Sequence, residues 1–286
     1  MRSLSCCVLL PILAVLAACG ASAAADDVAD DIDARVIDAP TSDATDLDLS
    51  KVYGHSGLVL YRLDTTTLLP VEIGPFANTG PLGILDIAID RNDRMLGITR
   101  DDVYTININT GAATRLTAFA AGTPDLTSLA FVPVDLNNPN SAERLVAAAD
   151  DGTVLEINQS SGVTSMLGSY GTAAGGIIKS SGDIVAVSGF GILATVTIGD
   201  PVTNPDYLAQ INPTTWAATP LTTGTTYDKI FGLGFWKGKV YGFVDRDALG
   251  GAIIEINPTT GAATPVNMGT IRWFGAGVAT DAPIID

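Results

Sequence analysis

The segment EINPTTGAATP, Glu255 to Pro265, recurs in the chain in two closely related forms. They are QINPTTWAATP at Gln210 to Pro220 and TININTGAATR at Thr105 to Arg115. Asn can bond to the backbone that follows it, Pro fixes φ at the next position, and Gly tolerates the left-handed conformation that closes a hairpin. Strand-like runs stand before and after each copy. The segment therefore predicts a strand, a turn and a second strand.

Two looser copies extend the repeat to five: LDTTTLLPV from Leu63 and INQSSGVTS from Ile157. Two more strand-like runs precede every hairpin except the first, such as GGIIKS from Gly175 and DIVAVS from Asp183, and the inner runs begin near Ile84, Leu126, Gly175 and Ile230. Units of four strands that recur about every 40 to 60 residues are typical of a β-propeller.

The first hairpin lacks an inner strand, and the last segment of the chain supplies one. The run KVYG from Lys51 matches the run KVYG from Lys239, and the run WFGAGVA from Trp273 matches an innermost strand. We therefore predict an all-β fold over residues 51–286: a five-bladed β-propeller with four-stranded blades, closed where the C-terminal strand joins the N-terminal blade. Closure of this kind removes an open sheet edge.

Residues 1–19 have the features of an export signal: a basic residue at Arg2, an apolar run from Cys7 to Ala18, and small residues before Cys19. All three cysteines lie in this region, so the remaining chain has no thiol for disulfides, metal binding or nucleophilic catalysis. The apolar run is too short for a comfortable membrane-spanning helix.

The sequence LAAC at Leu16 to Cys19 resembles the lipobox of bacterial lipoproteins. The resemblance implies that Cys19 becomes the first mature residue and carries acyl chains such as palmitate, which anchor the protein in a membrane of the cell envelope. Gly20 lacks the acidic character of an inner-membrane retention signal, so we expect the outer membrane. A plain cleaved signal peptide is the alternative, and the periplasmic or exterior side is left open.

Residues 20–50 are rich in Ala and then in Asp, with nine Asp and one Arg between residues 26 and 50. We expect a disordered, self-repelling tether that spans about 30 Å. The chain carries a net charge of −16 with only 15 basic residues. This balance excludes nucleic acid as a partner, because binding phosphates requires clustered Lys and Arg. We expect a monomer.

The repeat pattern over residues 51–280 resembles bacterial propellers with quinoprotein-type or YVTN-type repeats, whose units contain a strand ending in a D-x-x-T-G-like turn. Asp64 keeps that Asp, and Asn stands in its place at Asn107, Asn158, Asn212 and Asn257. The Trp that closes the quinoprotein repeat is absent from every unit, so we expect no quinone cofactor. The resemblance implies a binding face where the loops between second and third strands emerge.

On that face the loops between second and third strands carry pairs of acidic residues. The candidates for a binding rim are Asp101, Asp102, Asp150, Asp151, Asp200, Asp206, Asp245 and Asp247. Such a rim would suit Ca²⁺, which prefers six to eight oxygen ligands, or a cationic partner. Ordinary turn chemistry is the alternative, since Asp is a common turn former.

Three Asp residues near the inner strands are weak catalytic candidates: Asp86, Asp125 and Asp228. Asp86 stands near the start of an inner strand, where the other units have Ser128, Gly175, Gly232 and Gly275. Glycosidases use two acidic residues, one as general acid and the other as base or nucleophile. No Glu occurs in any inner strand, so the acid and base set is incomplete. The only His, His55, takes the place of Phe243 in the repeat and is expected to pack in the core.

The longest predicted loop runs from Ser188 to Asp206, with a small hairpin over the rim. The function that these patterns favour is that of an exported lipoprotein whose propeller binds a ligand or protein, with calcium as a possible requirement and a glycan or a protein as the partner. Two alternatives stay open: a carbohydrate-active hydrolase that uses the Asp residues at the channel mouth, and a structural envelope component without a ligand.

Overall fold

A computed structural model describes residues 49–64, 66–80, 83–200 and 204–285. The predicted signal peptide, its Cys19 and almost all of the predicted tether lie outside the described residues. The first strand, β1 (Leu49–His55), begins at the end of the predicted tether. Among the described residues no helix is long and apolar enough to cross a membrane.

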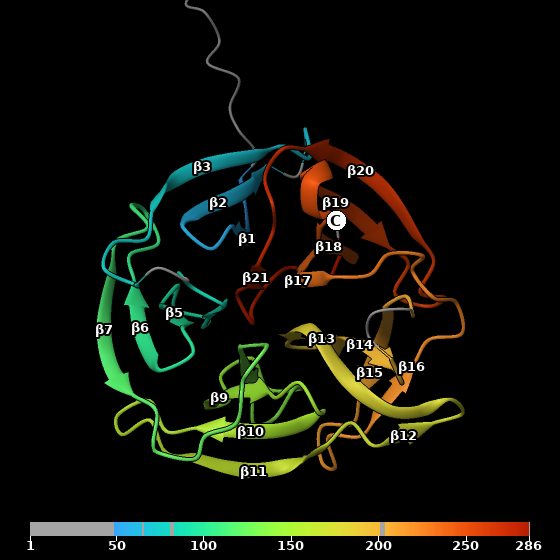
Figure 1. Ribbon diagram of the computed structural model, residues 1–286, viewed down its shortest axis with the longest axis horizontal. Coiled ribbons are helices and arrows are strands. Elements are labelled where there is room, and N and C mark those ends of the chain that lie inside the picture. Colours follow the sequence, from blue (N-terminus) through green and yellow to red (C-terminus); the bar gives the residue numbers. More distant parts are fainter. Residues whose placement is uncertain (1–48, 65, 81–82, 201–203, 286) are drawn as a thin grey trace, which may run out of the picture. The chain divides into compact units, whose positions relative to one another are not determined.

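The strands form five antiparallel sheets arranged around a common axis, as a five-bladed β-propeller (Figure 1). Each sheet is a blade, numbered here in chain order. Blade one contains, from the axis outward, β21 (Gly275–Val278), β1, β2 (Val59–Asp64) and β3 (Pro70–Pro75). Blade two contains β4 (Asp86–Ile89), β5 (Met95–Ile98), β6 (Asp102–Ile106) and β7 (Ala113–Ala118).

The other three blades continue the ring. Blade three contains β8 (Ala130–Pro133), β9 (Glu143–Ala148), β10 (Thr153–Ile157) and β11 (Thr164–Ser169). Blade four contains β12 (Thr172–Ala173), β13 (Gly176–Val187), β14 (Gly191–Ile198), β15 (Tyr207–Ile211) and β16 (Ala218–Pro220). Blade five contains β17 (Ile230–Trp236), β18 (Lys239–Asp245), the 3₁₀ turn Asp247–Leu249, β19 (Gly251–Ile256) and β20 (Ala263–Gly269).

The predicted ring closure is confirmed. Strand β21 lies antiparallel to β1, with Val52 opposite Val278 and His55 opposite Gly275. Figure 1 shows β21 near the ring axis, between β1 and β17. Blade one therefore combines the first and last described strands, and its inner edge is paired.

Blade four differs from the prediction. The runs GGIIKS and DIVAVS were expected as two strands, but they form one long strand, β13, with a register irregularity between Ser180 and Ile184. Its partner β14 contains the segment that was expected to be a loop hairpin, so the predicted loop from Ser188 to Asp206 is wrong. The Ser-Ser-Gly sequence that looked like a turn is the irregular part of a continuous strand. A β-bulge lets a strand bend there without ending.

The repeated hairpin turns form as the sequence predicts. The side-chain oxygen of Asn257 accepts the backbone N–H of Thr259 at 2.9 Å, and Asn212 does the same for Thr214 at 2.9 Å. Asp64 accepts the N–H of Thr66 at 2.9 Å. Equivalent bonds occur at Asn107 and Asn158. The residue pattern therefore acts through Asx turns.

Two of these turns place a bulky residue where the others have Gly. Leu68 and Trp216 have φ of 56° and 62°, close to the 73° of Gly111. A positive φ is disfavoured for such residues, so both turns accept some strain. Trp216 is 2% exposed and packs beneath the Arg144 guanidinium of blade three, which lies 5.9 Å from its ring centre. This packing between blades offsets the backbone strain.

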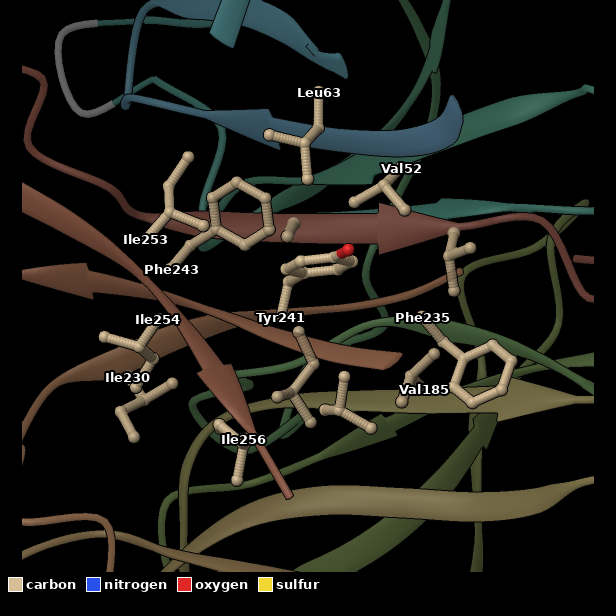
Figure 2. Close-up of a cluster of buried hydrophobic side chains, with 14 of the residues drawn as sticks. Val52, Leu63, Val185, Ile230, Phe235, Tyr241, Phe243, Ile253, Ile254 and Ile256 are labelled. Carbon is tan, nitrogen blue, oxygen red and sulfur yellow. The ribbon is translucent and has the colours of Figure 1, made fainter. Parts of the chain in front are cut away.

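The core lies between neighbouring blades. Figure 2 shows part of one cluster, in which Val52 and Leu63 of blade one approach Phe243 and Ile253 of blade five. Both faces of most strands are buried in this way, which explains why the strands do not alternate strictly between apolar and polar residues. Because the blades pack against one another, the inner strands hold the loops at the mouth of the ring in place.

Candidate functional site

A pocket of about 370 Å³ lies at the mouth of the ring, and all five blades contribute to its lining. Its apolar wall consists of Leu85, Leu126, Phe231 and Phe274. Its polar wall consists of Arg100, Asp125, Thr127, Asp150 and Ser181. The lining comes from the starts of inner strands and from loops between second and third strands, so the pocket opens on the predicted binding face.

A groove of about 550 Å³ adjoins the pocket between blades one and five. Phe274 lines both cavities and is 36% exposed. Leu58 and Tyr61 of blade one and Ile271 and Arg272 of blade five form the groove walls. The pocket and the groove therefore meet at the Phe274 side chain.

The polar wall of the pocket contains an ion pair. Arg100 Nη1 lies 2.8 Å from Asp125 Oδ1, and the side chains are 59% and 62% exposed. The Thr127 hydroxyl donates to the Ala148 carbonyl at 3.2 Å. A guanidinium has five N–H donors and a carboxylate has several lone pairs, so the pair retains hydrogen-bonding capacity toward a ligand.

The chain passes directly from the pocket lining into a buried layer at the ring axis. Leu85, Thr127, Gly182, Phe231 and Phe274 line the pocket, and the next residue in each case is buried. These buried residues are Asp86, Ser128, Asp183, Gly232 and Gly275. We call them the inner layer. One position of each blade therefore sits below the pocket, and in two blades it is an Asp.

Both inner-layer Asp residues tie their own blade to the next one. Asp86 Oδ2 accepts the N–H of Leu129 at 2.6 Å, which joins blade two to blade three. Asp183 Oδ2 accepts the N–H of Leu233 at 2.5 Å, which joins blade four to blade five. Asp86 is 0% exposed and Asp183 is 1% exposed. The two carboxyl groups lie close enough for each to influence the ionisation of the other.

His55 of blade one adjoins this pair. Its Nδ1 lies 2.8 Å from the Ser56 carbonyl, so Nδ1 carries the proton and Nε2 is an acceptor. Nε2 lies 3.9 Å from Asp86 Oδ1, and neither atom has a hydrogen-bond partner among the described residues. Gly275 leaves room for both side chains, because a Cβ there would lie 2.4 Å from each of these atoms.

Burial sets the protonation states of this group. It lowers the pKa of His55 to about 4, so the ring is neutral at physiological pH. Burial, followed by the charge of Asp183, holds the pKa of Asp86 well above its usual range. Burial also raises the pKa of Asp183. Two buried carboxyl groups this close cannot both ionise without a large penalty.

Sequence reasoning missed Asp183 and placed Gly175 at its position. The signal was present, since Asp183-Ile184-Val185-Ala186 repeats the order of Asp86-Ile87-Ala88-Ile89. The expectation that His55 packs in the core agrees with its 0% exposure.

The predicted rim residues fall into three groups: buried, paired with a base, and exposed. Asp206 and Asp245 are 2% and 4% exposed: Asp206 accepts the N–H of Ile230 at 2.9 Å, and Asp245 pairs with Arg272 at 2.6 Å. Asp102 pairs with Arg115 at 2.7 Å, and Asp247 pairs with Lys229. The exposed remainder consists of Asp101, Asp150, Asp151 and Asp200. Among the residues that the structure describes, no three His, Cys, Asp or Glu side chains gather to hold a metal ion.

The three catalytic candidates occupy different environments. Asp86 is fully buried in the inner layer, whereas Asp125 lies in the pocket wall beside Arg100. Asp228 is exposed ahead of β17. The structure therefore does not bring Asp86 and Asp125 together at the pocket surface as a solvent-accessible pair.

No protein-family profile matches the chain, and no curated protein matches it. Solved structures do resemble it. A symmetrical protein from work on de novo evolutionary emergence is 13% identical, with a TM-score of 0.49, over 82% of this chain and 99% of that one. BamB from Moraxella catarrhalis is 12% identical, with a TM-score of 0.35, over 77% of this chain and 59% of that one.

A protein of unknown function from Bacteroides caccae is 12% identical, with a TM-score of 0.42, over 79% of this chain and 97% of that one. The chain spans only 29% and 36% of two other solved chains, both described as extracellular domains of signalling systems from B. thetaiotaomicron. At these values the likeness is one of architecture, and no functional argument rests on it.

Proposed function

We propose that the propeller is a ligand-binding module whose site is the mouth pocket with its adjoining groove. The observation that carries this proposal is that all five blades contribute to one cavity of about 370 Å³. Concave sites with an apolar lining and a few polar groups are the usual form of ligand pockets. The hydrolase alternative gains no support here, because Asp86 is sealed below the pocket lining.

The pocket wall favours a neutral ligand with many hydroxyl groups, such as the end of a glycan. Arg100 and Asp125 already neutralise each other across 2.8 Å, so a charged ligand would have to compete with one of them. Hydroxyl groups both donate and accept, and they can bond to the pair without breaking it. Phe231 and Phe274 supply the apolar surface against which a sugar ring can pack.

The groove favours a ligand longer than one sugar unit. It begins at Phe274, which it shares with the pocket, and it continues past Leu58 and Tyr61. We therefore propose that a glycan end occupies the pocket and that the next unit lies along the groove.

The test is a glycan array followed by calorimetric titration of each hit. We expect Phe274→Ala to weaken binding at least tenfold, because it removes apolar surface from both cavities. Leu249→Ala is the matched control: Leu249 is 71% exposed and lies outside the pocket. Silence across the array, together with binding of a basic peptide, would replace the glycan proposal with a peptide-binding one. Equal loss in the two variants would place the ligand elsewhere.

We also propose that Cys19 carries the lipid anchor and that the protein is an envelope lipoprotein, with the outer membrane as its location. The LAAC sequence and the preceding apolar run support this. Labelling with a fatty-acid analogue is expected to mark the wild type and Cys6→Ala but not Cys19→Ala. Label retained in Cys19→Ala would contradict the anchor, and fractionation of the labelled cells locates the membrane.

Calcium binding at the exposed rim residues and a monomeric state stay predictions. Calorimetric titration with Ca²⁺ tests the first, with Asp150→Asn as the variant and Asp228→Asn as the control. Light scattering of the purified propeller tests the second.

A further inference from the structure

Three titratable side chains from three blades meet in and beside the inner layer. Asp86 comes from blade two, Asp183 from blade four and His55 from blade one. The carboxyl groups of Asp86 and Asp183 are close enough to influence each other's ionisation, and His55 Nε2 faces Asp86 Oδ1 at 3.9 Å. All three side chains are sealed from solvent, so the pocket above does not supply them with water or ions.

The strands around the cluster present backbone N–H groups to it. Strand β17 offers the N–H of Leu233, β21 that of Ala276, and the chain before β8 that of Leu129. One further titratable group is the Tyr170 phenol, whose pKa is raised by burial and, to a smaller extent, by the charge of Asp183. Tyr170 therefore stays a neutral phenol and adds no negative charge to the cluster.

The hydrogen bonds distinguish the two carboxyl groups. Asp183 accepts three backbone N–H groups, from Ile184, Leu233 and Ala276, so both of its oxygens are needed as acceptors. Asp86 Oδ2 accepts the N–H of Leu129 and the carboxyl group also lies beside the N–H of Ile87, while Oδ1 is buried without a hydrogen-bond partner among the described residues. An oxygen with acceptors around it and no donor is the one expected to carry a proton. The neighbouring acceptors are Asp183 and His55 Nε2.

We infer that a single proton on Asp86, shared with Asp183 and facing His55, fastens blades two and four together at the ring axis and acts as a pH-sensitive lock beneath the mouth pocket. Loss of the proton leaves two negative charges in a sealed layer. The pocket residues Leu85 and Gly182 directly precede Asp86 and Asp183, so repulsion between the carboxylates moves the pocket floor. The effect on ligand binding rests on the proposed function, whereas the effect on stability does not.

The direction of the pH dependence follows from linkage. The pKa of Asp86 is raised in the folded state from the ordinary value of 3.8. The stabilisation from the shared proton is therefore fully present below about pH 3.8. It is lost as the pH rises through the folded-state pKa of Asp86. Over that interval the folding equilibrium constant of the wild type falls about tenfold per pH unit, relative to a variant without this proton.

Two isosteric variants test the assignment. Asp86→Asn replaces the protonated carboxyl with an amide that has an acceptor for Leu129 and a permanent donor toward Asp183. We expect it to remain folded. Above about pH 3.8, its folding equilibrium constant is expected to rise relative to that of the wild type by about tenfold per pH unit. Asp183→Asn is the matched control: its amide nitrogen replaces one of the two accepting oxygens and faces a backbone N–H donor in either orientation. We expect it to lose at least tenfold in folding equilibrium constant at every pH, because backbone donors are left unsatisfied.

Carboxyl ¹³C NMR of the wild type tests the lock even if Asp183→Asn fails to fold. Above pH 3.8 we expect one carboxyl resonance that is lost in Asp86→Asn to report a protonated group after the exposed Asp residues have ionised. Two inner-layer carboxyl groups that ionise together with the exposed Asp residues would overturn the inference, as would equal destabilisation by the two variants or a parallel pH dependence of the wild type and Asp86→Asn. If a glycan ligand is found, its affinity is expected to fall with rising pH for the wild type but not for Asp86→Asn. Absence of any ligand would remove the proposed function and leave the lock standing.

Discussion

The inner layer and the pocket wall use the same side chain in opposite ways. In the pocket wall, Asp125 is 62% exposed beside Arg100. At the axis, Asp86 and Asp183 are 0% and 1% exposed, with a neutral His55 beside them. The Asp125 carboxylate is solvated and balanced by Arg100, whereas the inner pair is balanced by a proton. The difference shows that the degree of burial, and not the number of acidic residues, decides what an Asp does in this fold.

The energetic consequences differ as well. An exposed ion pair contributes about 0 to 1 kcal/mol, because water and salt screen it. A buried charge that loses its partner costs about 3 to 5 kcal/mol. Changes in the inner layer are therefore expected to alter the stability of the ring, and changes on the rim to alter its surface properties.

Removing the strand that completes the inner layer is expected to have the largest effect. Deletion of residues 272–286 removes β21, which pairs with β1 and supplies Gly275 and the N–H of Ala276. The remaining blade one would expose an unpaired edge, so we expect aggregation or rapid proteolysis. Deletion of residues 285 and 286 is the control, since Ile285 is 76% exposed. A soluble longer truncation that unfolds cooperatively would contradict closure as the source of stability.

Protonation of His55 is expected to be the next largest effect. Burial lowers its pKa from 6.5 to about 4, so the fold favours the neutral ring. The stabilisation from the neutral ring is present above pH 6.5. It is lost as the pH falls through the folded-state pKa of His55, by roughly 3 kcal/mol in total. His55→Asn keeps a donor for the Ser56 carbonyl and does not titrate. The difference in unfolding free energy between wild type and variant, measured from pH 7 to pH 4, isolates this group; a constant difference would show that His55 is accessible or paired.

Adding one methyl group to the inner layer is expected to have a smaller but measurable effect on stability than protonation of His55. A Cβ at residue 275 would lie 2.4 Å from both Asp86 Oδ1 and His55 Nε2. Gly275→Ala is therefore expected to destabilise the fold by about 1 to 3 kcal/mol, because neither buried group can move freely. Gly269→Ala in β20 is the control, since the nearest atom to its Cβ would be 3.6 Å away. Equal unfolding midpoints for the two variants would mean that the inner layer adapts easily.

Most of the architecture was predictable because it is repeated. The Asn residues of the hairpin turns, and the likeness of the runs at Lys51 and Lys239, marked the blades and their closure. Blade four was misread where Ser180, Ser181 and Gly182 form an irregularity inside β13. A turn and a bulge use the same small residues, and only the pairing with β14 distinguishes them. Local sequence could not show that pairing.

The site was less predictable because it depends on contacts across the ring. Asp86 was identified as unusual within its repeat, but its partner Asp183 comes from a blade that is not adjacent in the sequence. His55 was correctly expected to be buried, yet nothing in its neighbourhood indicated that it faces Asp86. The rim prediction treated Asp206 and Asp245 like the exposed residues around them. Their burial, at 2% and 4% exposure, depends on how neighbouring strands and Arg272 pack.

The smallest expected effect belongs to the exposed pair in the pocket wall. Asp125→Asn removes the charge opposite Arg100 and is expected to change the free energy of unfolding by less than about 1 kcal/mol, with a weak dependence on salt. Asp245→Asn sharpens the contrast, because Asp245 is 4% exposed and bonds to Arg272 through both oxygens, at 2.8 and 2.6 Å. If unfolding in denaturant shows equal losses for both variants, burial does not separate the two classes of carboxylate. A small loss at Asp125 combined with weaker ligand binding would instead show that a residue with little role in the fold has one in the pocket, as expected of a surface that a rigid ring displays.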